Sequence, residues 1–268
     1  MNSYRWNAKD YARHSSVQQA WARELIAKLD LQGNEAVLDI GCGDGKVTAE
    51  IASHVPDGSV LGIDSSADMI KTAQSGFAKP AFTNISFQVA NASQLPFENR
   101  FDIVFSNAAL HWVRDHTPVL KGIFKSLKNN GRILLQMGGQ GNASAIICIM
   151  NSMITTATWG KYFKDFEFPY GFHHPQDYHI WLDDAGFQST DARLIHKDMR
   201  YDDRAGLSGW IRTTWLPYTQ RIPDHIRNEF INELTDRYLE RYPPDSAGRI
   251  VIKMVRLEVE AVKLETLL

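Results

Sequence analysis

The chain has 268 residues, enough to bury a core as one large domain or two small ones without cross-links. Its 29 basic and 31 acidic residues are mixed along the sequence, and the formal net charge of −2 argues against nucleic acid or an anionic membrane as a partner. The two cysteines have neither metal-ligand spacing nor a disulfide pattern, so we expect no metal and a cytoplasmic location. No signal segment or long apolar run occurs, so we expect no membrane span.

Strand and helix patterns alternate through the first half of the chain. Helical spacing of apolar residues predicts helices over 17–31, 46–55, 66–78 and 117–127. Short apolar runs predict strands over 36–41, 59–64, 85–90, 101–107 and 131–137. Such alternation is typical of a parallel sheet covered by helices on both faces, so we predict an α/β, Rossmann-like three-layer sandwich.

The alternation stops after residue 137, where a segment rich in Gly, Asn and Ser leads into an aromatic stretch. The pattern then predicts a helix over 175–187, a strand over 189–201, helical material from 202 to 241 and a last strand over 249–263. We interpret the two late strands as an antiparallel C-terminal edge with a helical cap looped out between them. The predicted organisation is a single domain, 1–268, with its core at 30–140, 186–200 and 248–264 and its cap or lid at 1–29, 141–185 and 201–247.

The stretch "VLDIGCGDG", residues 37–45, joins an apolar strand to a turn with glycines at 41, 43 and 45. Glycine tolerates positive φ and leaves no Cβ between the backbone and a ligand. A dinucleotide site usually has G-x-G-x-x-G, but Lys46 stands where the third glycine would be. The pattern therefore favours a ligand without pyrophosphate, and an NAD-dependent oxidoreductase is the alternative enzyme class.

Polar residues follow the next three strands at their carboxyl ends. Asp64 ends the second strand, where a carboxylate can accept hydrogen bonds from both ribose hydroxyls; a plain helix N-cap is the alternative. The Asn91-Ala92 corner follows the third strand, and Asn107 ends the fourth. Because the carboxyl ends of parallel strands share one edge of the sheet, these residues predict a site for a nucleoside ligand there.

In this order and spacing the four elements resemble those of the class I S-adenosylmethionine-dependent methyltransferases over residues 35–136. The resemblance implies S-adenosyl-L-methionine as cofactor, with the glycine turn beside its methionine part, Asp64 at the ribose and Asn91 and Ala92 at the adenine. It also implies that the Asn107 backbone lies near the methionine amine. The candidate cofactor-binding residues are Asp39, Gly41, Cys42, Gly43, Asp64, Ser65, Asn91, Ala92, Ser93 and Asn107. We expect Cys42 to offer its backbone rather than a nucleophilic thiol.

A narrower resemblance extends over nearly the whole chain. The segments "WNAKDY", "SNAALHWV", "WIRTTWLPYTQRIP" and "YPPDSAGRIVIKMVRLEVEAVK" are similar to the trans-aconitate methyltransferases and, more loosely, to the juvenile hormone acid methyltransferases. This implies a small-molecule acceptor and O-methylation of the carboxylate of a small organic acid by in-line displacement. Methylation at N or C of another small metabolite and a non-catalytic binding module are the alternatives.

The candidate residues at the acceptor are aromatic, basic or imidazole side chains outside the glycine turn. We predict catalytic roles for His111 and Tyr11, and substrate contacts for Trp6, Tyr11, His111, Trp112, Arg212 and Trp215. The alternatives are core packing for Trp112, a staple of the N-terminal arm for Trp6 and Tyr11, and a charged surface for Arg212. We interpret the histidines at 173, 174 and 179 as solvated loop residues rather than metal ligands.

Overall fold

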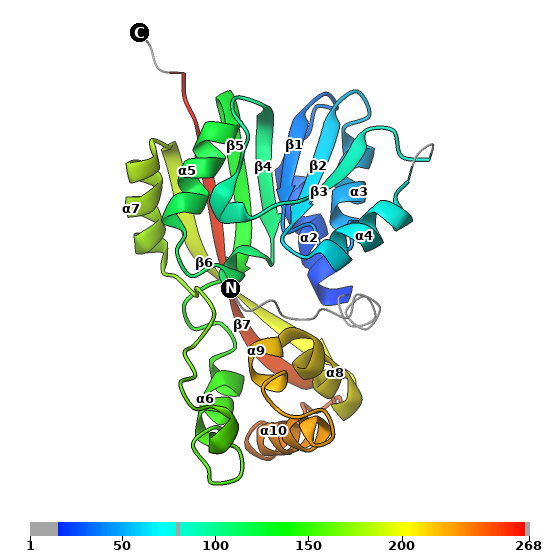
Figure 1. Cartoon of the computed structure of the whole chain (residues 1–268), viewed down its shortest axis with the longest axis vertical. Helices are drawn as coiled ribbons and strands as arrows, with labels where there is room; N and C mark the ends of the chain where they lie inside the picture. The colour runs from blue at the N-terminus through cyan, green and yellow to red at the C-terminus, as the bar shows by residue number, and fades with distance from the viewer. Residues whose placement is uncertain (1–15, 79–80, 266–268) are drawn as a thin grey trace. The chain divides into compact units, whose positions relative to one another are not determined.

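The computed structural model describes residues 16–78 and 81–265. Helices and strands alternate through the first half of the chain, and most of the later helices come between β5 and β7 in the sequence (Figure 1). In chain order the elements are α2 (Ser16–Lys28), β1 (Ala36–Ile40), α3 (Lys46–His54), β2 (Ser59–Asp64), α4 (Ala67–Gly76), β3 (Ile85–Val89), η1 (Ala92–Gln94), β4 (Phe101–Asn107), η2 (Leu110–Trp112), α5 (Thr117–Ser126), β5 (Leu127–Gly138), α6 (Ser144–Met153), η3 (Gly160–Tyr162), α7 (Pro175–Ala185), β6 (Gln188–Tyr201), α8 (Arg204–Thr214), α9 (Leu216–Thr219), α10 (Arg227–Arg241) and β7 (Ile250–Val262).

The strands form one sheet in the order β3-β2-β1-β4-β5-β7-β6. The first five strands pair in parallel, and β7 runs antiparallel to β5. The expected mostly parallel sandwich with an antiparallel C-terminal edge is therefore confirmed, and within that edge β7 lies inside while β6 is outermost. Since β1 has β2 on one side and β4 on the other, the strand order reverses between β1 and β4. Ligands of such sheets bind beyond the carboxyl ends of the strands at this point.

Two hydrophobic clusters cover the two faces of the sheet. On one face Leu25 of α2 and Ile51 of α3 pack with strand residues such as Val37. On the other face Ile123 of α5 and Tyr178 of α7 pack in the second cluster. Strand side chains alternate between the two faces, so β1, β2, β4 and β5 each contribute to both clusters, and this double burial gives the sandwich its three layers.

The chain divides into two compact units. The sheet unit consists of Gln18–Gln140, Tyr170–Ile195 and the chain from Arg256, and the helical unit contains Gly141–Pro169 and His196–Val255. These boundaries differ from those expected from the sequence, where 1–29 and 141–185 were assigned to the cap. Helices α2 and α7 instead belong to the sheet unit, because each buries an apolar face in one of the two clusters of the sheet.

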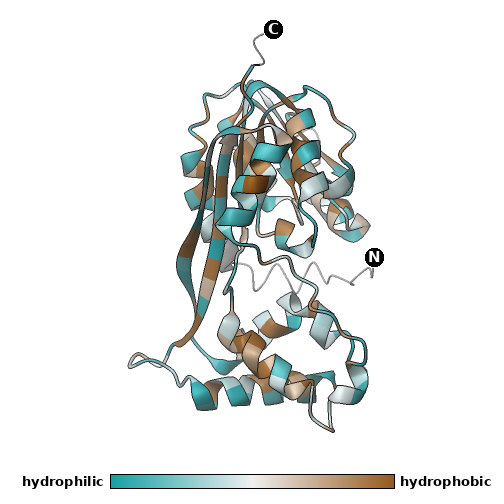
Figure 2. Cartoon of the chain, turned by 90° about the vertical axis from the view of Figure 1, so that its left-hand side faces the viewer, coloured by the Kyte–Doolittle hydropathy of each residue, from teal (hydrophilic) through white to brown (hydrophobic). Residues whose placement is uncertain are grey.

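The helical unit has an aromatic interior of its own. The rings of Phe163 and Phe230 stack with centroids 5.9 Å apart, and the ring of Trp159 meets Phe230 edge to face at 5.2 Å. Helix α6 is rich in hydrophobic residues and α10 is largely hydrophilic (Figure 2), and α10 packs against both α6 and α8. Among the described residues, no helix combines the length and the apolar character that a bilayer span requires.

Candidate active site

The turn between β1 and α3 has a left-handed backbone at each of its three glycines. The φ angles are +77° at Gly41, +54° at Gly43 and +85° at Gly45, a region that side-chain-bearing residues rarely adopt. The Gly41 N–H donates to the carbonyl of Ile63 at 2.7 Å, which holds the turn against the end of β2. A Cβ atom on Gly43 would meet nothing within 4 Å. The backbone at Gly43 is therefore bare, as a closely approaching ligand requires.

Asp64 ends β2 beside this turn. Its Oδ2 accepts from the Gly43 N–H at 3.1 Å and its Oδ1 from the Ser66 N–H at 2.8 Å. Burial raises the pKa of the carboxyl, and the hydrogen bonds from Ser66 and Gly43 oppose this shift. The N-cap of α4 is Ser66, whose side chain accepts from Met69, so the interpretation of Asp64 as the cap is wrong. Each carboxylate oxygen of Asp64 keeps a further lone pair for a ligand hydroxyl.

Two further residues of this segment are buried behind the turn. Asp39 accepts from the Thr48 hydroxyl at 2.7 Å. Burial raises the pKa of Asp39 to about 7, although the Thr48 hydrogen bond works in the opposite direction. Burial also raises the pKa of the Cys42 thiol well above its usual range, so the thiol stays protonated and is no nucleophile.

The corner after β3 lies next to Asp64. The Ala90 N–H donates to the carbonyl of Asp64 at 3.0 Å, which joins the ends of β2 and β3. Asn91 caps the short helix η1, because its Oδ1 accepts from the Ser93 N–H at 2.9 Å. Ser65 is exposed at the same edge of the sheet.

The segment after β4 packs against the glycine turn. Ala108 follows Asn107 with φ +56°, and its N–H donates to the carbonyl of Gln136 in β5 at 2.8 Å. The Cβ atom of Ala109 then occupies the space in which a side chain on Gly41 would lie. The segments after β1 and β4 thus meet where the strand order reverses, the position at which sheets of this kind bind ligands.

Residues 31–186 match the family described as a methyltransferase domain. The chain belongs to this methyltransferase family. An uncharacterized methyltransferase of Schizosaccharomyces pombe is 34% identical over 205 residues, which cover 73% of this chain and 77% of that protein. A trans-aconitate 2-methyltransferase of Methylobacterium radiotolerans is 28% identical over 262 residues, covering 96% and 98%. The structure of the YcgJ protein from Bacillus subtilis has the same fold, with a TM-score of 0.64 at 17% identity, and covers 92% of this chain and all of that one.

These relationships confirm the expected enzyme class, a class I S-adenosylmethionine-dependent methyltransferase, and its cofactor. They also decide against the NAD-dependent oxidoreductase. The family match covers the glycine turn, the end of β2 and the segment after β4, which the structure brings together at one edge of the sheet.

His111 lies just beyond β4 in the methyltransferase, among aromatic rings. Its centroid is 5.8 Å from that of Trp112 and 6.0 Å from that of Tyr170. Its Nδ1 accepts from the Gly138 N–H at 3.3 Å. Burial, with a smaller contribution from the positive charge of Arg256, lowers the pKa of His111 to about 3. The ring is therefore neutral at pH 7, and because Nδ1 is an acceptor, the hydrogen is on Nε2.

His116 supports the loop that carries His111, and the sequence analysis did not identify it. It is fully buried, and its Nε2 donates to the carbonyls of Leu110 and Val113, each at 2.9 Å. Its Nδ1 accepts from the Tyr178 hydroxyl at 2.5 Å. Tyr178 is 62 residues away in the sequence, so no local pattern could have predicted this pair.

The histidines of the 173–179 segment were expected to be solvated, and for His173 this is wrong. Its ring is partly buried, with its centroid 4.4 Å from that of His116, because α7 packs onto the sheet unit. His174 is the N-cap of α7, where its Nδ1 accepts from the Gln176 N–H at 3.2 Å. Within the described part of the chain, no three His, Cys, Asp or Glu residues are grouped so that they could hold a metal ion.

The remaining predicted substrate residues belong to the other unit or lie outside the described residues. Arg212 and Trp215 belong to the helical unit. Arg212 is exposed on α8, and Trp215 is buried with its ring centroid 5.7 Å from that of Trp210. Trp6 and Tyr11 lie outside the described residues.

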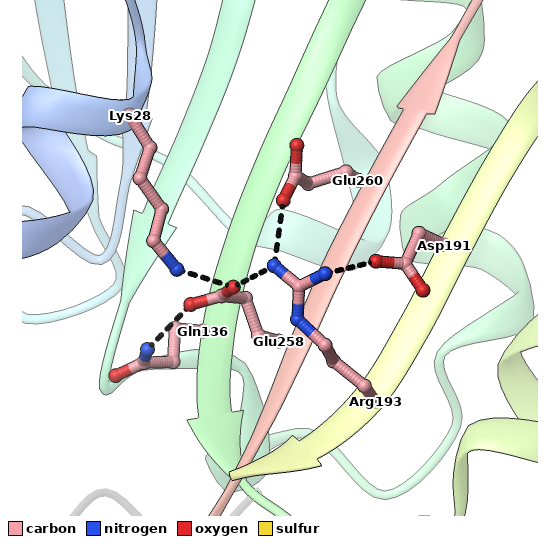
Figure 3. Close-up of polar contacts among 6 residues, drawn as sticks. All are labelled: Lys28, Gln136, Asp191, Arg193, Glu258 and Glu260. Atoms are coloured by element: carbon pink, nitrogen blue, oxygen red, sulfur yellow. Dashed lines mark hydrogen bonds and ion pairs between the residues drawn. The ribbon is translucent and has the colours of Figure 1, made fainter.

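A polar network in the sheet unit also escaped the sequence analysis (Figure 3). At its centre the buried carboxylate of Glu258 in β7 accepts from Lys28 at 2.6 Å, from Arg193 at 2.7 Å and from Gln136 at 3.0 Å. Burial raises the pKa of Glu258, but the hydrogen bonds from Lys28 and Arg193 outweigh it and hold the pKa below the usual value. The network joins α2, β5, β7 and β6, so it fixes the antiparallel edge of the sheet.

Proposed function

We propose that the methyltransferase transfers a methyl group to a carboxylate oxygen of a small organic acid and releases a methyl ester. The observation that carries the proposal is the 28% identity with a trans-aconitate 2-methyltransferase over 96% of the chain. The name of that relative identifies a small carboxylic acid as its substrate. Relatives of the same name from Rhodopseudomonas palustris support the proposal at 26% and 27% identity over the same share of the chain.

The residues at the carboxyl edge of the sheet fit the cofactor. The bare backbone at Gly43 suits the close passage of the methionine part, and the remaining lone pairs of Asp64 suit the two ribose hydroxyls. We assign the adenine to the corner of Asn91, Ala92 and Ser93 with the exposed Ser65, and the methionine amine to the Asn107 backbone. Asp39 and Cys42 support the turn from behind, Asp39 through Thr48.

The reaction requires a correctly positioned acceptor rather than a general base. S-adenosylmethionine, when bound, supplies an electrophilic methyl group on a sulfonium sulfur, and the electron pair of the C–S bond stays on sulfur as the new C–O bond forms. A carboxylate with a reference pKa near 4 is already ionised at neutral pH, so no proton has to be removed. Holding an acceptor in line at reacting distance contributes about 7 to 11 kcal/mol of barrier lowering.

His111 can orient the acceptor because it offers a neutral hydrogen-bond donor. Because its pKa is about 3 and its Nδ1 accepts from Gly138, the Nε2–H is a donor at every pH near neutrality. We propose that this N–H holds the carboxylate oxygen that is not methylated. Trp112 contributes a wall of the same site, and the roles of Trp6, Tyr11, Arg212 and Trp215 remain predictions.

Transfer of radiolabelled methyl groups tests the proposal. The acceptor panel contains trans-aconitate, other di- and tricarboxylates, fatty acids and, as controls, primary amines. We expect labelled products from a carboxylate and release of the label as methanol on alkaline hydrolysis, because esters are cleaved by base. A base-stable product would instead indicate methylation at nitrogen or carbon.

A further inference from the structure

The imidazole of His116 and the phenol of Tyr178 form a buried polar pair in the sheet unit. Both side chains are fully buried. His116 is the N-cap of α5 and Tyr178 belongs to α7, so the pair connects two helices that pack against each other. Polar groups buried among apolar side chains are costly unless each of them has a hydrogen-bond partner. The partners of this pair therefore indicate what it does.

Three partners fix the hydrogens of the His116 ring. Its Nε2 lies 2.9 Å from the carbonyl oxygens of both Leu110 and Val113. Because carbonyl oxygens only accept, Nε2 carries a hydrogen, and Nδ1 of the neutral ring is left to accept from the Tyr178 hydroxyl at 2.5 Å. The hydroxyl of Tyr178 thus holds the one neutral tautomer of His116 that can donate to both carbonyls.

The two carbonyls belong to the turn that carries His111. Leu110 is the first residue of η2 and Val113 directly follows its last, so the Nε2–H of His116 joins the two ends of η2. A 3₁₀ helix of three residues makes few hydrogen bonds of its own, and Ala109 at its N-cap supplies no side-chain hydrogen bond. The bridge made by His116 is therefore a main support of this turn.

Two further contacts hold His111 from other segments of the sheet unit. The Gly171 N–H donates to the carbonyl of His111 at 2.9 Å, and the Gly138 N–H donates to its Nδ1 at 3.3 Å. The first contact fixes the backbone and the second fixes the ring, which leaves Nε2–H as the donor of the ring. Both contacts depend on where η2 lies, so the His116 bridge determines whether they form together.

We propose that His116 is a positioning residue for methyl transfer, which together with Tyr178 holds η2 so that the Nε2–H of His111 meets the carboxylate of the acceptor. In-line transfer depends on the distance and angle of the acceptor oxygen, and a misplacement of about 1 Å costs about 100-fold in rate. His116 contacts neither acceptor nor cofactor in this arrangement and acts through η2 alone. This inference rests on the proposed carboxylate methylation and identifies what orients its acceptor.

His116→Gln and His116→Phe separate the hydrogen bonds of this residue from its packing. The glutamine amide is an N–H donor of similar reach to Nε2, whereas the phenylalanine ring keeps the contacts with Tyr178 and Trp181 but donates nothing. The matched control is Ser126→Ala, which removes another fully buried donor. The Ser126 hydroxyl donates to the carbonyl of Gly122 at 2.7 Å, at the opposite end of α5 from His116.

The kinetic probe is the carboxylate that the wild type methylates best. We expect kcat to fall about 10- to 100-fold in His116→Phe, to stay within about fivefold in His116→Gln and to stay within about twofold in Ser126→Ala. The dissociation constant of S-adenosylhomocysteine should stay within about threefold in all three variants, because the glycine turn and Asp64 are unchanged. A merely structural role would not be rescued by glutamine, and it would give His116→Phe and Ser126→Ala equal losses.

Heteronuclear NMR of the histidine side chains measures the same effect without turnover. The signal of His111 is identified by its absence from His111→Gln, and in the wild type it should show the Nε2–H tautomer. We expect His116→Phe to shift this signal toward a mixture of tautomers, whereas His116→Gln and Ser126→Ala should leave it in place. An unchanged His111 signal in a folded His116→Phe protein contradicts the proposal.

Tyr178→Phe keeps the test decisive if His116→Phe does not fold. It retains the packing of α7 and removes only the hydroxyl, so kcat should fall about 3- to 10-fold because the tautomer of His116 is no longer held. An unchanged kcat in folded Tyr178→Phe overturns the proposal. If the wild type methylates a carboxylate and a folded His116→Phe has the wild-type kcat, the proposal about His116 fails alone. A wild type that methylates no carboxylate refutes the proposed function and this inference with it.

Discussion

Gly41 and Ala109 are in such close contact that a Cβ atom built on Gly41 would lie 2.0 Å from the Cβ atom of Ala109. This contact joins the turn after β1 to the segment after β4, at the point where the strand order of the sheet reverses. The glycine at 41 is therefore required by packing as well as by its φ of +77°, whereas Gly43 of the same turn faces open space.

We predict that Gly41→Ala and Gly43→Ala separate stability from cofactor binding. Gly41→Ala combines a positive φ with overpacking and should lower the free energy of unfolding by about 2 to 5 kcal/mol. Gly43→Ala introduces only backbone strain and should lower the free energy of unfolding by about 1 to 2 kcal/mol. Its methyl group, however, enters the space assigned to the cofactor. Its affinity for S-adenosylhomocysteine should fall at least about tenfold, or about 1.4 kcal/mol. Denaturant titration measures the stability and calorimetry measures the affinity. A Gly43→Ala protein with wild-type affinity would contradict the assignment of the turn to the cofactor site.

Asp64→Ala should weaken S-adenosylhomocysteine binding by about 2 to 4 kcal/mol, because a charged acceptor for two hydroxyls is lost. The variant also leaves the Gly43 and Ser66 N–H groups without their carboxylate, so some loss of stability is expected. Asp68→Ala, at an exposed position in the first turn of α4, is the control. Calorimetry on the folded variant is the measurement, and an affinity within twofold of the wild type contradicts the ribose assignment.

His111→Gln should retain part of the activity and His111→Phe should lose most of it. The glutamine amide still offers an N–H donor, whereas phenylalanine keeps the aromatic packing with Trp112 and Tyr170 but donates nothing. We expect kcat/KM for the carboxylate to fall about tenfold more in the Phe variant, which corresponds to one hydrogen bond to a charged group. Equal activity of the two variants would show that His111 acts through packing alone.

Protonation of His116 should destabilise the fold in acid. Burial lowers its pKa to about 4 in the folded protein, whereas the unfolded chain has a value near 6.5. Between these values the unfolded state binds the additional proton, so the stability due to neutral His116 is present above pH 6.5 and is lost as the pH falls, by about 1.4 kcal/mol per pH unit.

Comparison with His116→Gln isolates this contribution from the rest of the protein. Asp39 acts in the opposite direction, since its pKa is raised to about 7 and its protonated form stabilises the fold in acid. The stability difference between the wild type and His116→Gln should therefore be measured at several values from pH 7.5 to pH 4.5. A difference that does not change with pH would mean that the histidine is accessible to protons in the folded state.

Glu258→Ala should lower the free energy of unfolding by about 1 to 3 kcal/mol, less than for a fully buried ion pair because Lys28 and Arg193 can be rehydrated. The side chains of these two cations are 40% and 47% exposed. The matched control is Glu260→Ala, which removes a 44% exposed carboxylate from Arg193 and should change stability by less than about 0.5 kcal/mol. Equal effects in denaturant titrations would contradict the central role of Glu258.

The sequence alone determined the local features of the cofactor side of the site. Neighbouring residues were enough to predict the strand at Val37 to Ile40, the glycine turn after it and the position of Asp64 at the end of β2. Strand propensity, turn geometry and helix initiation each act over only a few positions. The prediction of a mostly parallel sheet followed from the local alternation of strand and helix patterns. The structure agrees at each of these elements.

The tertiary structure alone decided which distant residues lie close together beyond β4 and along β5. His116 depends on Tyr178, which lies 62 residues further along the chain, and Arg256 reaches Gly138 only because β7 inserts antiparallel between β5 and β6. Strand order and register are set by the total burial of the sheet faces, not by the residues next to each strand. For the same reason the sequence analysis named Arg212, whose aromatic neighbours are close along the chain, and gave no indication of the buried Arg256, whose neighbours Trp21 and Gly138 are distant in sequence.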